Sequence, residues 1–141
     1  MRTLRAFRRS LHHDERGAAM VEFALVAGVI FIPLVFGIIE FGRLIWAKNM
    51  VTAAAREGVR FAIVRGSAYG LAGGTVADSA SVADYVKGRT QLTPINVSTS
   101  WTPAKDPQDT VTVTVSYTYA PIVPVIASKT VTGVSKQIIA F

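Results

Sequence analysis

One glutamate near the N-terminus occupies a position where its charge demands an explanation. Glu22 lies five residues after Gly17, within Gly-Ala-Ala-Met-Val-Glu-Phe, the stretch that opens a long apolar run. A carboxylate at membrane depth is energetically expensive and usually has a partner of opposite charge. We interpret Glu22 as a carboxylate that requires such a cation. The alternative is an interfacial glutamate whose side chain merely reaches the membrane surface.

The rest of the chain offers little for catalysis or metal binding. It has no cysteine, which excludes disulfides, thiolate metal sites and cysteine nucleophiles, and its two histidines, His12 and His13, precede the apolar run. Four aspartates follow residue 75 without a recognisable catalytic motif: Asp78, Asp84, Asp106 and Asp109. We therefore expect no enzyme activity, no metal and no cofactor.

The element that must position Glu22 is a membrane-spanning helix. No charged residue occurs from Phe23 to Ile39, and this run raises the mean hydropathy of the chain to +0.38. A helix from Ala18 to Ile39 would be about 33 Å long, enough to cross the ~30 Å hydrocarbon core. We predict a single span, and Glu22 lies inside it or at its edge.

The distribution of charge bears on the orientation of this span. The net charge is +6, and residues 1–17 contribute half of it, because this segment contains five arginines and only two acidic residues. A basic segment before a span favours a cytoplasmic leader over residues 1–17. Basic residues from Arg43 to Arg65 also follow the span, so charge alone does not decide the orientation. No basic cluster is interleaved with aromatic residues, so we expect no nucleic acid partner.

Residues 18–65 are predicted to form one long helix that becomes amphipathic from Glu40 onwards. Pro33 lies within this helix and is expected to bend it. Glu40 is spaced for an i,i+3 ion pair with Arg43, which we expect to be solvated at the outer interface of the membrane. The apolar stripe of the amphipathic half comprises Leu44, Ala47, Val51, Ala54, Ala55, Gly58 and Ala62.

Residues 66–141 are predicted to form a small α+β domain that begins with a loop and a helix. Four glycines within residues 66–74 indicate a helix stop followed by a loop. A second, short helix is expected over residues 75–88, with Thr75 or Ser79 as its N-cap. Its expected apolar face comprises Val76, Ala80, Ala83 and Val86.

After this helix the apolar period changes to two, which is typical of β-strands. Strands are predicted over residues 95–101, 110–119 and 129–140. Residues 75–141 are too few to form an independent core, so the sheet is expected to pack on the amphipathic half of the long helix. The predicted fold class is α+β, with a long, partly transmembrane N-terminal helix on a small antiparallel sheet. The residues of the last strand expected to point inward are Val134, Ile138 and Ala140.

The stretch from Gly17 to Phe23 resembles the class III signal peptide of type IV pilin-like proteins. In that family a membrane peptidase cuts after the glycine, and a glutamate is the fifth residue of the mature chain. Counting from Ala18, Glu22 is fifth and Phe23 sixth, as in the tight-adherence branch, where an aromatic follows the glutamate. The resemblance implies processing between Gly17 and Ala18, with Glu22 and Phe23 read by the peptidase. Small residues at 18 and 19 suit an extended segment at the cut.

A wider resemblance covers residues 16–64 and points to the TadE-like family of tight-adherence pilus proteins. Its motifs occur here in the family's order: Glu22-Phe-Ala-Leu-Val26, Pro33, Gly37-Ile-Ile-Glu-Phe-Gly-Arg43 and Ala53-Ala-Ala-Arg-Glu-Gly58. The C-terminal half agrees only in general style, through a glycine loop followed by valine–threonine strands.

This resemblance implies a pilin-like subunit, a minor pilin or pseudopilin of the tight-adherence (Flp) pilus. Such a protein is held in the inner membrane with an extracytoplasmic C-terminal domain, is cut by the prepilin peptidase and assembles with other pilin subunits. In type IV pilin-like proteins the N-terminal helices pack together, and the fifth-position carboxylate can neutralise a neighbour's N-terminal amine, here that of Ala18. Candidate residues for helix–helix contacts are Gly37, Glu40, Gly42 and Arg43.

Two other interpretations stay open. An uncut single-span envelope protein would keep residues 1–17 and use its C-terminal part to bind a partner or a surface. A secreted protein cut near residues 53–55 is disfavoured, because the apolar region of an ordinary signal peptide is about 7–15 residues long. Pro33 and Glu40 would also be unusual in such a signal peptide.

Overall fold

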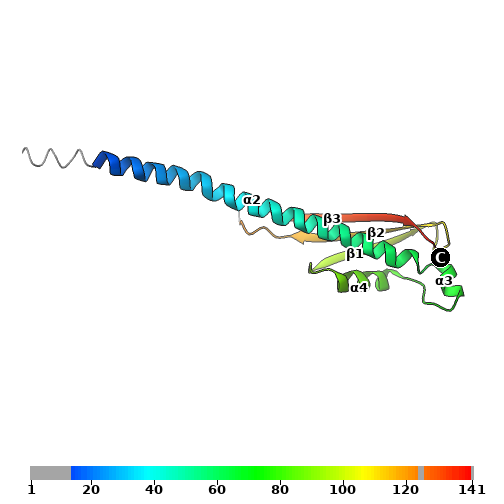
Figure 1. The fold of residues 1–141 in the computed structure, drawn as a ribbon. Coiled ribbons are helices and arrows are strands. Elements are labelled where there is room, and N and C mark those ends of the chain that lie inside the picture. Colours follow the sequence, from blue (N-terminus) through cyan, green and yellow to red (C-terminus); the bar gives the residue numbers. More distant parts are fainter. Residues whose placement is uncertain (1–13, 124–125, 141) are drawn as a thin grey trace, which may run out of the picture. The chain divides into compact units, whose positions relative to one another are not determined.

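The computed structural model describes residues 14–123 and 126–140, and side chains from Gly17 onwards (Figure 1). The chain divides into two compact units that meet within one helix, between Ile39 and Glu40. We call residues 14–39 the N-terminal unit and residues 40–140 the C-terminal unit. The elements in chain order are α2 (Asp14–Ile63), α3 (Ser67–Leu71), α4 (Ser79–Arg89), β1 (Ile95–Thr102), β2 (Thr110–Tyr119) and β3 (Lys129–Ile138).

The N-terminal unit is the first half of α2, and its apolar side chains lie exposed on all sides of the helix. Its most apolar window has a mean hydropathy of 2.5, and none of that window is buried. A helix that is apolar all round is stable where lipid or other protein covers it. The prediction of one long N-terminal helix is confirmed by α2, which ends at Ile63 rather than at the predicted residue 65, includes Pro33, and is long and apolar enough to cross a membrane.

The C-terminal unit contains a three-stranded antiparallel sheet of order β1-β2-β3, with β2 in the centre. Along β2, Val111, Val113 and Val115 are fully buried, whereas the threonines between them are partly exposed. This alternation follows from the two-residue period of a strand, which sends successive side chains to opposite faces. The sheet therefore has one apolar face and one open face rich in serine and threonine, and the predicted α+β fold class is confirmed.

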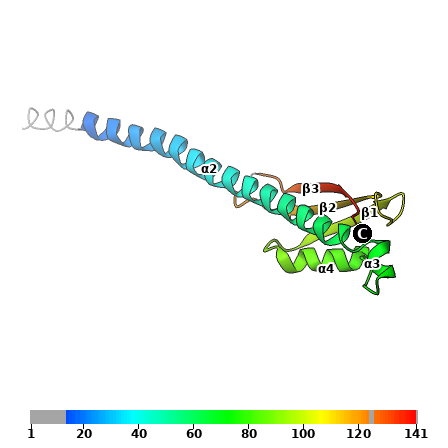
Figure 2. The same ribbon diagram turned by 45° about the vertical axis from the view of Figure 1, so that its right-hand side comes forward.

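The second half of α2 lies on the apolar face of this sheet (Figures 1 and 2). Its predicted stripe is confirmed, because every member is buried except Leu44, which is half-buried, and Val59 adds to it. Two glycines allow the close approach. A Cβ at Gly133 of β3 would collide with the backbone of Val51, and a Cβ at Gly58 of α2 would lie 3.0 Å from Cγ1 of Val113.

The short helix α4 packs beside α2 through Val82 and Val86, both fully buried, and the ring of Phe61 in α2 stacks on Tyr85 at a centroid distance of 4.4 Å. Of the predicted apolar face, Val86 is buried and Ala83 half-buried, whereas Ala80 is exposed and Val76 lies before the helix. The predicted N-cap was wrong, because Asp78 takes that position.

The N-cap of α4 is a capping box. Asp78 Oδ1 accepts a hydrogen bond from the backbone N–H of Ser81 at 2.7 Å, and the Ser81 hydroxyl accepts one from the Asp78 N–H at 3.0 Å. These bonds with Ser81 hold the pKa of Asp78 below its ordinary value. The helix therefore starts at Ser79, later than the predicted residue 75. The glycine-rich stretch before it, predicted as a loop, contains the single-turn helix α3.

The side chains of β3 point to the opposite faces of the sheet from those predicted. Val134 is 58% exposed and Ile138 is 64% exposed, whereas Val131 and Gly133 of the same strand are buried. The register with β2 explains this, because Gly133 lies opposite Val115 and must carry no side chain beneath α2. Ala140 is also exposed, and Ile139, which follows the strand, is buried instead.

Candidate functional site

The first half of α2 carries the predicted processing and pairing residues. Gly17, Ala18, Glu22 and Phe23 are all helical and all exposed. The Gly17–Ala18 bond is helical in the structure, whereas small residues there suggested an extended segment.

Glu22 contacts no cation within the described part of the chain. The ion pairs there are Glu40–Arg43 at 3.6 Å and Glu57–Arg60 at 3.7 Å. A helix confines each side chain to neighbours three or four residues away. The residues at those spacings from Glu22 are apolar, namely Ala18, Ala19, Leu25 and Val26.

Gly37 and Gly42 lie on open surface of α2. A Cβ built at either position would meet no atom within 4 Å. Among the residues that the structure describes, therefore, nothing requires glycine at these positions, in contrast to Gly58 and Gly133. Small residues of this kind permit close approach of a second helix in a membrane.

Glu40 begins the C-terminal unit and is the centre of a polar cluster. It is only 7% exposed. Its Oε1 accepts a hydrogen bond from the hydroxyl of Tyr119, at the end of β2, and its Oε2 accepts one from the backbone N–H of Ile122 at 3.2 Å. Arg43 lies one turn further along α2, with Nη1 3.6 Å from Glu40 Oε2 and its guanidinium 5.4 Å from the centroid of the Tyr119 ring.

Within this cluster the Tyr119 hydroxyl is harder to ionise than a free tyrosine. Tyr119 is only 5% exposed. Its burial is the larger cause, and its hydrogen bond to Glu40 the smaller cause, of a hydroxyl pKa above the ordinary value. A neutral tyrosine donating to a carboxylate is a charge-assisted hydrogen bond, which is stronger than a bond between neutral groups. The cluster therefore ties α2 to the loop that follows β2.

The prediction of a solvated Glu40–Arg43 pair was wrong for Glu40. The pair itself forms, and Arg43 keeps 42% of its side chain exposed, but Glu40 is covered by Tyr119 and the following loop. Sequence reasoning missed Tyr119 and Ile122 as partners of Glu40. The available signal was Tyr119 itself, since a buried tyrosine hydroxyl usually finds a partner.

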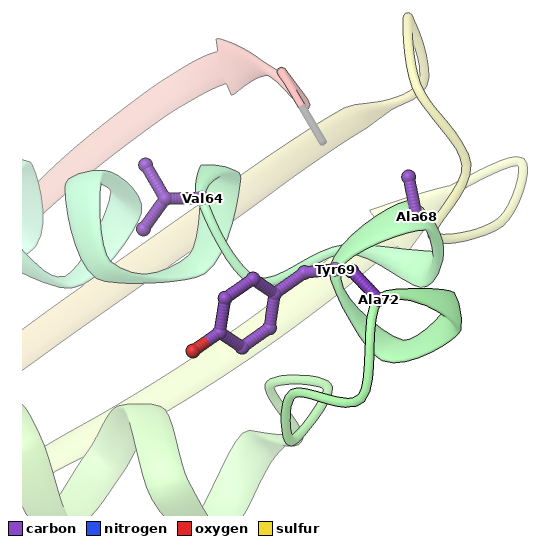
Figure 3. Close-up of a pocket in the computed structure, with 4 residues that line it drawn as sticks. All are labelled: Val64, Ala68, Tyr69 and Ala72. Atoms are coloured by element: carbon purple, nitrogen blue, oxygen red, sulfur yellow. The ribbon is translucent and has the colours of Figure 1, made fainter.

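An apolar hollow at the far end of the C-terminal unit shows no comparable chemistry. It is lined by Val64, Ala68, Tyr69 and Ala72. Figure 3 shows the ring of Tyr69 crossing it, with the hydroxyl pointing away from Ala68 and Ala72. Among the residues that the structure describes, no group of three histidine, aspartate or glutamate side chains is arranged to hold a metal ion.

Comparison with known proteins identifies the helical segment. The model of the family described as TadE-like protein matches residues 17–60. The match begins at Gly17, includes Glu22 and Glu40, and ends within the buried part of α2, before the sheet. No curated protein and no solved structure matches the chain. The match covers less than half of the chain and lies entirely within α2, which is long and apolar enough for a single membrane span.

Proposed function

This chain is TadE-like over residues 17–60, and on that premise we propose that it is a minor pilin or pseudopilin of the tight-adherence (Flp) pilus. In this proposal the prepilin peptidase cuts between Gly17 and Ala18. The mature chain is held in the inner membrane by α2, with the C-terminal unit outside the cytoplasm. Its role is structural, in assembly with other pilin subunits.

The observation that carries the proposal is the combination of the processing motif with an uncovered helix. Gly17, Glu22 and Phe23 stand in pilin register, and the apolar surface around them is exposed on all sides of α2. In an isolated chain, only lipid could cover this apolar surface. Neighbouring pilin helices would cover it, and the exposed Gly37 and Gly42 would let them approach closely.

Cleavage would also supply the cation that Glu22 lacks. It would leave an ammonium group on Ala18, in or near lipid. At a separation of 4 Å, opposite unit charges attract by about 4 kcal/mol at an effective dielectric constant of 20, against about 1 kcal/mol in water. Within one straight helix Ala18 and Glu22 are already near each other, so the pair favours assembly only where the ammonium belongs to a neighbouring subunit.

The direct test is the N-terminus of the protein from native membranes. We expect intact mass and N-terminal sequencing to show a chain that starts at Ala18, and the full chain to accumulate in cells without the prepilin peptidase. Gly17→Leu should block the cut, because a side chain before the scissile bond would collide with the peptidase.

Gly28→Leu is the matched control, since Gly28 is also a glycine of α2 with no atom within 4 Å of a built Cβ. It should be cut normally. A chain that begins anywhere other than Ala18 would contradict the proposal. Retention of residues 1–17 in the presence of the peptidase would favour the uncut, membrane-anchored envelope protein.

A further inference from the structure

The loop between β2 and β3 presents an apolar surface that pilus assembly through α2 does not use. Residues 120–127 contain no polar side chain. Within the described part of this loop, Ile122 is 56% exposed and Ile126 is 48% exposed. The backbone N–H of Ile126 donates to the carbonyl oxygen of Val123 at 3.0 Å, which closes a turn directly after Ile122.

This turn is bound to the residue at which the apolar run of α2 ends. Ile39 is the last residue of the uncharged run, and Glu40 follows it directly. Glu40 accepts hydrogen bonds from the Tyr119 hydroxyl and from the N–H of Ile122. The loop is therefore held at the residue of α2 that directly follows the uncharged run.

The surface next to the turn changes from apolar to basic. Lys48, about two turns beyond Glu40, lines a groove between α2 and β3 together with Lys129, the first residue of β3. Lys48 Nζ donates to the carbonyl oxygen of Thr132, and Lys129 is exposed. Trp46, in the same stretch of α2, is also exposed. An apolar edge followed by an aromatic residue and lysines is the pattern of a membrane–water interface.

We propose that the β2–β3 loop is a second membrane contact, in which Ile122 and Ile126 enter the boundary between headgroups and acyl chains while Lys129 faces lipid phosphate. The partner is the lipid surface itself. The inference rests on the proposed membrane anchorage of α2. Two attachment points, the span and the loop, would restrict how the C-terminal unit is oriented on the membrane.

The absence of cysteine in the chain allows a site-specific test. Single cysteines at Ile122, Ile126, Ser100 and Ile30 would carry an environment-sensitive fluorophore in the full chain, reconstituted in phosphatidylcholine–phosphatidylglycerol vesicles. Lipids with a spin label near the headgroup report shallow contact at positions 122, 126 and 100, and lipids with a spin label deep in the acyl chain report the position of Ile30 in the span. Ser100 is an exposed control on the open face of β1, and Ile30 is the control inside the span.

We expect the labels at positions 122 and 126 to be quenched several-fold more strongly than the label at position 100. Removing phosphatidylglycerol should weaken quenching at position 126, and Lys129→Gln should remove that lipid dependence. Circular dichroism of each variant would establish that the fold is kept, since both isoleucines are exposed.

Quenching at 122 and 126 no stronger than at 100, with normal quenching of the label at 30, would overturn the loop contact alone. If the labels at 122 and 126 become shielded from the quencher only as the protein-to-lipid ratio rises, the loop contacts a second copy of the chain. That result would also overturn the proposed contact between the loop and lipid. An unquenched label at 30 would remove the anchor and the loop contact together. The N-terminus at Ala18 is measured independently of all three outcomes.

Discussion

The two halves of α2 belong to one helix, but their apolar side chains differ in burial. Before Glu40, the apolar side chains are exposed on every side. After Glu40, the apolar residues keep to one stripe that the sheet and α4 bury. The apolar surface of the first half is therefore uncovered in the described part of the chain, whereas the apolar stripe of the second half is buried by its own chain.

The two glutamates of this helix repeat the difference. Glu40 is buried and receives hydrogen bonds from Tyr119 and Ile122, with Arg43 nearby. Glu22 is exposed and has no cation in the described part of the chain. A carboxylate with internal partners stabilises the fold, whereas one without them can stabilise an assembly. This contrast predicts that variants in the two halves will fail in different assays.

The largest effect is expected from Glu22→Gln. Loss of the charge removes an attraction to a neighbour's Ala18 ammonium of at most about 4 kcal/mol, less whatever the chain's own Ala18 ammonium already supplies. We expect pilus assembly to be lost while membrane insertion and the thermal stability of the C-terminal unit are retained, as checked by counting sheared pili and by fractionation. Glu57→Gln, which removes an exposed ion pair with Arg60, is the matched control and should assemble normally. Normal piliation of Glu22→Gln would refute the pairing role.

The next effect concerns the contact between α2 and the sheet. Gly133→Ala places a Cβ against the backbone of Val51 and Thr52. Because backbone cannot rotate away as a side chain can, we expect the free energy of unfolding to fall by about 3 kcal/mol. The measurement is chemical denaturation of the full chain in detergent, followed by tryptophan fluorescence.

Gly88→Ala is the control for this substitution, since a Cβ at that position in α4 meets no atom within 4 Å. It should leave stability unchanged or raise it by up to about 1 kcal/mol, because alanine is the better helix former. Equal stabilities of the two variants would show that the close packing of β3 on α2 does not support the fold.

The smallest effect, and the one most specific to Glu40, is expected from Tyr119→Phe. Removing the hydroxyl deprives the buried carboxylate of one donor, at a cost of about 2 kcal/mol near neutral pH. Tyr117→Phe is the control, because Tyr117 lies on the same face of β2 and is half-buried. An unchanged unfolding free energy in Tyr119→Phe would argue against the cluster as a tie between α2 and the loop.

The same variant has a defined pH dependence. The folded-state pKa of Tyr119 is raised, so the unfolded chain releases this proton at a lower pH than the folded chain does. The stabilisation by Tyr119 is therefore complete below about pH 10, the ordinary pKa of tyrosine, and is lost as the pH rises towards the raised value. The stability difference between the parent and Tyr119→Phe should shrink above about pH 10.

Much of the fold could be predicted because it depends on local periodicity. The buried stripe of α2 and the alternation of β2 are both visible as repeats along the chain. The facing of β3 could not be predicted in this way, because Val131 and Val134 offer apolar residues on both faces. The choice between them depended on Gly133, whose lack of a side chain matters only beneath Val51. The N-cap of α4 was ambiguous for a similar reason, since Asp78, Ser79 and Thr75 are all good capping residues.

By itself the sequence determined that this protein has an apolar helix in which Glu22 stands in pilin register. It also determined that the apolar stripe of the second half of α2 and the apolar face of β2 must pack together. These features follow from spacing, and spacing is a local property. Only the tertiary structure decided that Glu40 is the carboxylate with internal partners. Glu40 and Tyr119 lie 79 residues apart, and no period along the chain relates them. Their contact exists because α2 and β2 pack face to face, which brings the end of one strand to the residue where the apolar run stops.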